Sequence, residues 1–266
     1  MNRIMRIIAF TNNKGGTGKS TLCGNCAHWL AHAGQRVLVV DLTSQRTSSL
    51  LLLGDVDDVE EEGSILALLR SDPQVEIRDL IYESDKGMDV IPSHVLMAHG
   101  VEHLNQIGAG REGILNAQLL QLQEDYDFIL LDSPGDLNVL TTNVLVAADL
   151  VVIPTRLNRT DFSCTEVTLR FVRQAQPLIG SRTCRVVINM LDDRYLPGNA
   201  WAGSHTGQLY QLAQERFGDV LSSVTIPDST DIRTAFDRGS VVWEYRPESM
   251  AAQRLRRLVE VELYGV

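Results

Sequence analysis

The sequence has no apolar run near the length of a membrane span, which takes about 18–20 consecutive residues. Its opening stretch, MNRIMRIIAF, is too short for a secretion signal and lacks a small-residue cleavage site. Internal repeats, low-complexity linkers and a Pro/Gly-rich hinge are absent as well. These absences argue against a membrane or secreted protein, and they favour one cytoplasmic domain spanning residues 1–266.

Cysteine is scarce: the four present in 266 residues do not make a disulfide framework and fit reduced thiols. Cys23 and Cys26 form a C-x-x-C, a spacing that redox and zinc sites use. Both fall on the apolar stripe of the helix that we expect at 19–34, and no second C-x-x-C completes a set of four ligands. Packing in the core is therefore the favoured interpretation of this pair.

The formal net charge of −10 argues against a protein wrapped as a whole in nucleic acid. The charge is unevenly spread, however. Residues 1–133 hold 10 Lys and Arg against 19 Asp and Glu, whereas residues 134–266 hold 14 against 15. All 14 of those later cations are arginines. A local arginine face on an acidic protein and a scatter of solvated charges both remain open.

Short β-rich apolar runs alternate with longer stretches of helical period along the chain. The runs lie at 7–10, 37–42, 88–92, 128–132, 150–155, 185–190 and 222–227, and helices are expected at 19–34, 94–106, 111–122, 139–147, 163–178, 205–217 and 248–263. Strands with continuous apolar residues are buried on both faces. The pattern predicts an α/β fold, a single doubly wound domain with a mostly parallel central sheet flanked by helices. Because the first run starts so early, we expect no N-terminal helix-turn-helix module.

The segment AFTNNKGGTGKSTL, at 9–22, combines a strand end, a glycine-rich turn and a helix start. Its glycines, at positions 15, 16 and 18, let successive N–H groups point inward and form an anion nest at the positive end of the helix. Lys19 can then reach the β and γ phosphates of a nucleotide, and Ser20 supplies a hydroxyl for Mg²⁺. The strict phosphate-loop motif fails only because Asn13 replaces its first glycine, with a second lysine, Lys14, directly after it.

Two other strand ends carry acids. Asp41 closes VLVVD and Asp132 closes FILLD. Because ligands gather outside the carboxyl ends of parallel strands, both carboxylates should converge with the glycine loop on one crevice. We expect each to hold Mg²⁺ through water.

Three segments, NKGGTGKST, VLVVDLTSQRTSS and YDFILLDSPGDLNVLTTNVLVAADLVVIPT, resemble the deviant Walker A, Walker A′ and Walker B motifs of the ParA/MinD family of ATPases. The stretch from TIPDSTDIRTAF onward is similar to that family's closing segment, so the likeness spans essentially the whole chain. The resemblance implies ATP and Mg²⁺ as cofactors and a nucleotide sandwich dimer in which Lys14 reaches the partner's phosphates. It implies that ATP binds Lys14, Gly15, Gly16, Thr17, Gly18, Lys19, Ser20, Thr21, Asn189 and Pro227, with catalysis by Lys14, Lys19, Asp41 and Asp132.

One departure from the family concerns hydrolysis. The family's D-x-D-P-Q stretch here reads Asp41-Leu42-Thr43-Ser44-Gln45, so Thr43 occupies the place of the aspartate that positions the attacking water. Threonine can orient water but is a very poor base at neutral pH. We therefore expect a slow ATP hydrolase, with an ATP-loaded clamp that hardly hydrolyses as the alternative.

The family's branches separate by simple features. The switch segment DSPGDLN has no cysteine near it, which excludes the iron–sulfur branch. Near the end of the sequence, arginines precede Glu260 and Glu262, a poor match to an anionic lipid surface, so attachment to a membrane, as in MinD, is a lesser alternative. The partition branch binds nonspecific DNA through basic residues, which alignment places at Arg194 and Arg233, and closing-helix arginines such as Arg254 and Arg257 could extend the patch. We expect a nucleoid-associated homodimer that moves plasmid, chromosomal or other cargo with a ParB-like partner.

A rival of another class rests on histidines. HGVEH, at 99–103, fits the H-x-x-E-H zinc signature of an inverted metallopeptidase, with both histidines on one helix face. Gly100 weakens the helix and no third ligand stands out, so surface histidines are the favoured interpretation. His28 and His32 also lie four residues apart, and we expect them opposite the apolar stripe of their helix.

Overall fold

The structure is a computed structural model that describes residues 5–70, 74–180, 182–192 and 204–264. In this part of the chain seven strands form one sheet in the order β3-β4-β2-β5-β1-β6-β7. The strands are β1 (Arg6–Phe10), β2 (Val37–Asp41), β3 (Tyr82–Glu83), β4 (Asp89–Ile91), β5 (Phe128–Asp132), β6 (Leu150–Arg156) and β7 (Thr183–Asn189). All neighbours run parallel except β3 and β4, at one edge. The mostly parallel sheet predicted from the sequence is confirmed.

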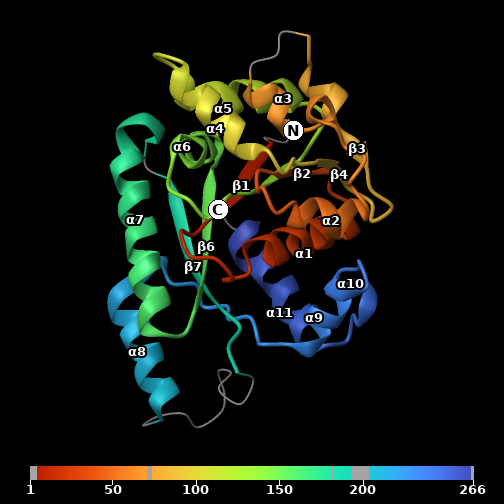
Figure 1. Cartoon of the computed structure of the whole chain (residues 1–266). Helices are drawn as coiled ribbons and strands as arrows, with labels where there is room; N and C mark the ends of the chain where they lie inside the picture. Colours follow the sequence, from red (N-terminus) through yellow and green to blue (C-terminus); the bar gives the residue numbers. More distant parts are fainter. Residues whose placement is uncertain (1–4, 71–73, 181, 193–203, 265–266) are drawn as a thin grey trace.

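Helices cover both faces of this sheet (Figure 1). One layer contains α1 (Lys19–His32), α2 (Thr47–Leu53), α9 (Thr230–Asp237), α10 (Val242–Tyr245) and α11 (Met250–Leu258). The other contains α3 (Ile65–Leu69), α4 (Met97–Gln106), α5 (Ile114–Leu119), α6 (Val139–Ala147), α7 (Arg159–Ile179) and α8 (His205–Phe217). Alternate residues of β1 supply the two cores, Ile7 to the second layer and Ile8 to the first. Burial on both faces explains why β2 and β5 are apolar up to their final aspartates.

The strand register brings the candidate site together. In the parallel pairs, Asp132 lies opposite both Asp41 of β2 and Phe10 of β1. Three strands therefore end at one level, and the turn that leaves β1 for α1 begins at the same edge of the sheet as the two aspartates.

The predicted strand at 222–227 is wrong. This segment makes only isolated bridges, Val186 with Leu221 and Leu191 with Pro227, although the N–H groups of Ser222 and Ile226 still donate to the carbonyls of Val186 and Ile188 in β7. The N–H of Val224, between these two donors, instead donates to the Ser222 hydroxyl at 3.0 Å. The ladder is therefore interrupted at Val224, and a continuous strand does not form.

The C-terminal helix also differs from its prediction. The helix expected at 248–263 is α11 to Leu258 and then a π-helical turn over Val259–Leu263. Likewise, α5 is flanked by 3₁₀ turns at Arg111–Gly113 and Leu120–Leu122, so the helix predicted at 111–122 is in three pieces. In the described ranges, the other 3₁₀ turns are Glu61–Gly63, Ile77–Leu80 and Gly218–Val220.

Candidate functional site

The turn from β1 to α1 is shaped by glycines with positive φ. Gly16 has a φ of 71° and Gly18 a φ of 90°, a region that L side chains rarely adopt. At Gly18 a Cβ atom would also lie 2.2 Å from Nδ2 of Asn189. Because no side chain caps α1 at Gly18, the first N–H groups of the helix stay open toward the turn. The turn therefore offers backbone donors to an anion at the positive end of a helix.

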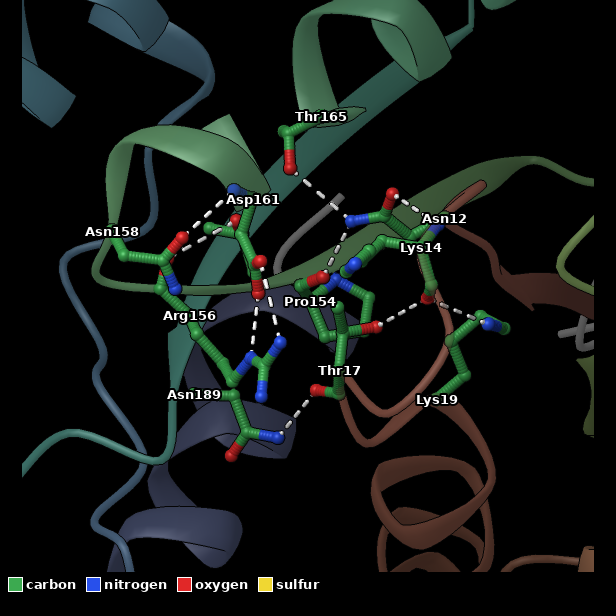
Figure 2. A network of polar contacts seen from close by, with 11 residues as sticks. Asn12, Lys14, Thr17, Lys19, Pro154, Arg156, Asn158, Asp161, Thr165 and Asn189 are labelled. Carbon is green, nitrogen blue, oxygen red and sulfur yellow. Dashed lines mark hydrogen bonds and ion pairs between the residues drawn. The ribbon is translucent and has the colours of Figure 1, made fainter. Parts of the chain in front are cut away.

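Buried side chains hold this turn against β6 and α7. Asn12 Nδ2 donates to the carbonyl of Pro154 at 2.8 Å and to Thr165 Oγ1 at 3.2 Å, while Asn12 Oδ1 accepts from the N–H of Lys14 at 3.2 Å (Figure 2). The N–H of Asn13 donates to Thr168 Oγ1 at 3.1 Å. The residue that replaces the first glycine thus anchors the loop. The sequence reasoning missed this network, although threonines on the core face of α7 were its signal.

The two lysines of the loop lie on different sides of it. Lys19 Nζ donates to the carbonyl of Lys14 at 3.3 Å, and Figure 2 shows the Lys14 side chain extending away from Lys19. Lys19 lines the larger of two pockets that adjoin the loop, described below as the first pocket, and Lys14 does not. Burial lowers the pKa of Lys19, an effect that nearby Asp132 and Asp136 oppose. Lys19 is therefore a partly buried cation directed at the pocket.

Asp41 is a fully buried carboxylate with four hydrogen bonds. Its Oδ1 accepts from Thr43 N at 2.9 Å and Thr43 Oγ1 at 2.8 Å. Its Oδ2 accepts from Ser49 N at 2.9 Å and Ser49 Oγ at 2.8 Å. Burial raises the pKa of Asp41, and these four donors work against the rise. The donors fix Asp41 firmly behind the pocket.

Asp132, beside it, is equally buried but incompletely bonded. Its Oδ2 accepts from Ser48 Oγ at 2.7 Å, and its Oδ1 has no hydrogen-bond partner among the described residues. Burial first, and then the charge of Asp41, raise the pKa of Asp132 to about 7, against the hydroxyls of Ser20 and Ser48 and the charge of Lys19. A buried oxygen without a partner, next to a second carboxylate and a serine hydroxyl, fits the hard oxygen ligands that Mg²⁺ prefers.

Two pockets adjoin the loop and share Thr21 and Thr47. The first, of about 460 Å³, is lined by Asn13, Gly15, Gly16, Gly18, Lys19, Ser20, Thr21, Thr43, Ser44, Gln45, Thr47, Ser133, Pro134, Gly135 and Asp136. The second, of about 290 Å³, is lined by Thr21, Leu22, Thr47, Asn189, Met190, Pro227, Asp228, Ser229, Ile232, Arg233, Phe236 and Asp237. Asn189 and Pro227, predicted together, lie in this more apolar pocket, and Asn189 Nδ2 also donates to the carbonyl of Thr17 at 2.8 Å (Figure 2).

Three of the four predicted DNA-binding arginines lie on helices in the layer of α1. Arg233, on α9, pairs with Asp228 at the second pocket. Arg254 is partly exposed and Arg257 exposed on α11, and neither has an ion-pair partner within the described ranges. Arg194 lies outside the described residues.

The histidines fall into two places. His99 and His103 are on α4, and in the described part of the chain no group of three or more His, Cys, Asp or Glu side chains gathers as a metal site would. His28 is buried, which contradicts its expected place opposite the apolar stripe. The reason is that α10 packs over this part of α1, with His28 Nε2 3.3 Å from Glu244 Oε1.

No helix in the described ranges is both long and apolar enough to cross a bilayer. The predicted C-x-x-C cysteines are both buried in the core, and burial raises the pKa of each thiol.

A glycine loop at a helix start, a partly buried lysine in a polar pocket and two strand-end carboxylates define the class of P-loop nucleotide-binding proteins. A family model described as an AAA domain matches residues 5–180. The chain belongs to the ParA/MinD family of ATPases, as that match and its relatives show.

Two relatives match over nearly their full lengths. The sporulation initiation inhibitor protein Soj of Bacillus subtilis (strain 168) is 31% identical over 251 residues, covering 93% of this chain and 94% of that protein. The chromosome-partitioning ATPase Soj of Thermus thermophilus is 29% identical over 259 residues, covering 96% and 94%. Among solved structures, a cobyrinic acid a,c-diamide synthase from Mycobacterium smegmatis with bound ATP analog and magnesium has a TM-score of 0.81, 25% identity, and coverage of 98% and 95%.

Proposed function

We propose that this chain binds Mg-ATP in the two adjoining pockets and uses it as a switch for dimerisation and DNA binding. The observation that carries the proposal is the orphaned carboxylate oxygen of Asp132 below a helix start that presents a glycine nest and Lys19. Gly15, Gly16, Thr17 and Gly18 would bind the phosphates through backbone N–H groups, with Lys19, Ser20 and Thr21 at the start of α1.

Mg²⁺, when bound, would neutralise phosphate charge. Ser20 would ligate it directly, and Asp41 and Asp132 would hold its water ligands. The bound cation would also add to the positive charge that Lys19 already provides near the buried Asp132.

The adenine base would occupy the second pocket. Its lining is mostly apolar, with Leu22, Ile232 and Phe236 available to contact the base, and Asn189 and Pro227 lie on the same wall. Because the pockets share Thr21 and Thr47, one nucleotide can reach from the base site to the glycine loop. Asn189 is also bonded to the carbonyl of Thr17, so it would link the base site to the loop.

The dimer would form across the phosphates. Lys14 is only partly buried, extends away from Lys19 and lies outside the lining of its own pocket (Figure 2). A lysine placed in this way suits contact with the phosphates of a second subunit, and dimer formation would then depend on ATP.

The ATP dimer would bind DNA without sequence preference. Arg233, Arg254 and Arg257 lie in one helical layer, and Arg194, outside the described residues, is the fourth candidate. The two relatives named Soj support a role in segregation, so the cargo would be a plasmid, a chromosome site or another body. A ParB-like partner would stimulate hydrolysis, and the protein would be cytoplasmic and nucleoid-associated.

An attachment to membranes like that of MinD has less support. The apolar face of α11 is buried, with Leu255 and Leu258 in the core against α1, so it is not free to enter a lipid interface. We also propose that residues 1–266 form one domain, because Arg6, at the start of β1, donates to the carbonyl of Leu263 at 2.6 Å.

The DNA proposal is tested by charge reversal on α11. Arg257→Glu should abolish retention of a nonspecific duplex in a low-salt gel shift with ATP, while ATP-dependent dimers persist in sedimentation. Arg256→Glu is the matched control, because Arg256 already pairs with Glu260 at 2.7 Å and lies over the Trp29 ring. Equal retention by Arg257→Glu and the unaltered protein would exclude this face as the DNA site, and loss of DNA binding in both variants would show a nonspecific charge effect.

A second candidate is an ATP-loaded clamp that hardly hydrolyses. It is favoured by Thr43, whose hydroxyl already donates to Asp41 at 2.8 Å and has no charge with which to accept a proton. Phosphate release, measured with and without DNA, separates a cycling switch from a clamp.

A further inference from the structure

The first pocket has a single carboxylate in its lining. Asp41 and Asp132 are fully buried behind the pocket, and neither lines it. The other polar groups there are hydroxyls, amides, backbone groups and Lys19. Among the described residues that line this pocket, Asp136 is the only acid. It lies in the turn that follows β5, four residues after Asp132.

The turn that carries Asp136 is held in place by the start of α6. The hydroxyl of Thr141 donates to the backbone carbonyl of Asp136. Asn138 caps α6, with its Oδ1 accepting from Leu140 N at 2.9 Å and Thr141 N at 3.3 Å. The same turn passes close to Lys19, because a Cβ atom at Gly135 would lie 3.9 Å from Lys19 Nζ. The backbone thus fixes Asp136 on the side of the pocket reached by Lys19.

The Asp136 carboxylate itself is exposed and has no hydrogen-bond or ion-pair partner in the described part of the chain. Its negative charge is close enough to act on Lys19, which it helps to keep protonated. A carboxylate that is fixed by its backbone but free at its oxygens can accept a proton from water in the pocket.

The neighbouring side chains cannot take this role. The Thr43 hydroxyl donates to Asp41, and the four hydrogen bonds to Asp41 occupy both of its oxygens. Gln45 also lines the pocket and can orient water, but an amide does not accept a proton at neutral pH. Asp132 is buried below the pocket next to Asp41.

We propose that Asp136 orients the attacking water and acts as its general base in ATP hydrolysis. It would take over the role of the family's aspartate, whose position is occupied here by the uncharged Thr43. A water oxygen forms a bond to the γ-phosphorus as the bond from that phosphorus to the β–γ bridging oxygen breaks. The electron pair of the broken bond stays on ADP, and the water proton passes to the Asp136 carboxylate and then to solvent. The proposal rests on the ATP hydrolysis of the proposed function.

The test uses the full-length Asp136→Asn variant, which keeps the shape of the side chain and removes its basicity. The kcat for phosphate release should fall roughly 100-fold. Binding of a fluorescent ATP analogue should stay within twofold of the unaltered protein, which shows that the pocket is folded. Gln45→Ala is the matched control from the same lining, and its kcat should fall far less.

A second variant distinguishes base chemistry from a structural role. Thr43→Asp in the Asp136→Asn background returns a carboxylate to the pocket and should recover most of the lost kcat, whereas a merely structural defect would persist.

Three outcomes overturn the proposal. The first is an Asp136→Asn kcat within twofold of the unaltered value, and the second is an equal loss in Gln45→Ala, which would assign water positioning to the amide. The third is an unaltered protein that binds ATP but releases no phosphate, which would leave nucleotide binding intact and remove only this step. If the unaltered protein does not bind ATP, the proposed function fails with it.

Discussion

Asp132→Asn tests whether the buried carboxylate under the glycine loop destabilises the protein without nucleotide. Burial and the charge of Asp41 raise the pKa of Asp132 from 3.8 to about 7. Because the folded-state pKa lies above that of the unfolded chain, the folded protein binds an extra proton between about pH 4 and pH 7. Stability therefore rises as the pH falls through this window, and it is lowest above pH 7, where Asp132 is ionised.

The size of the effect follows from the same shift. A rise of about three pKa units corresponds to about 4 kcal/mol of lost stability once Asp132 is fully ionised. Between pH 8 and pH 6, the part of this cost that is relieved is roughly 1 kcal/mol. Asparagine removes the charge but leaves an unpaired amide at the orphaned position, which costs about 1–3 kcal/mol. At pH 8 the variant should thus be more stable than the unaltered protein, by about 1–3 kcal/mol.

Urea unfolding without nucleotide, at pH 8 and pH 6, measures both the stability difference between the two proteins and its dependence on pH. The difference between the unaltered protein and Asp132→Asn cancels other titrating groups, and the exposed Asp219→Asn supplies a control. Asp132→Asn should also lose Mg²⁺-dependent ATP binding, so that it gains stability and loses function together. An Asp132→Asn protein that is less stable at pH 8, or that keeps the full pH dependence, would refute this reasoning.

Three further changes have distinct readouts. Gly18→Ala should abolish ATP binding in a fluorescence titration, because its Cβ would lie 2.2 Å from Asn189 Nδ2, whereas Gly34→Ala shares a positive φ but meets nothing within 4 Å and should keep binding. Asn189→Ala should lower the affinity for ATP about tenfold without changing the affinity for tripolyphosphate, which has no adenine. An equal loss of affinity for both ligands would contradict the placement of adenine beside Asn189. Burial lowers the pKa of His28, so the folded state resists its protonation, and stability should fall as the pH drops below about 6.5. In thermal unfolding at pH 7 and pH 5, His28→Gln should reduce that fall. An unchanged fall would show that His28 is not its cause.

The parts of the site that follow from local sequence could be predicted. Glycines occur at 16 and 18 because the backbone there has a positive φ. The apolar runs that end in Asp41 and Asp132 are continuous because their strands are buried on both sheet faces. Parallel register then places the two acids side by side without further information. These features depend on residues near in the chain or on a periodic pattern.

The remaining parts depend on contacts between distant residues. Asn12 bonds Thr165, which is 153 positions away, and no local pattern indicates that an asparagine after β1 will anchor the loop to α7. His28 is buried only because α10 packs over α1. The expected strand at 222–227 had the apolar composition of one, yet the Ser222 side chain takes a ladder donor. Side-chain competition for backbone groups is decided by tertiary geometry.

In the proposed dimer, Lys14 joins two subunits across their nucleotides. Sedimentation velocity of Lys14→Ala with Mg²⁺ and a non-hydrolysable ATP analogue measures whether it does, with Lys86→Ala as the control because Lys86 pairs with Asp85 at 3.0 Å, outside both pockets. We predict dimers for the unaltered protein and for Lys86→Ala, and monomers for Lys14→Ala that still binds the analogue. Dimers of Lys14→Ala as tight as those of the unaltered protein would contradict the claim.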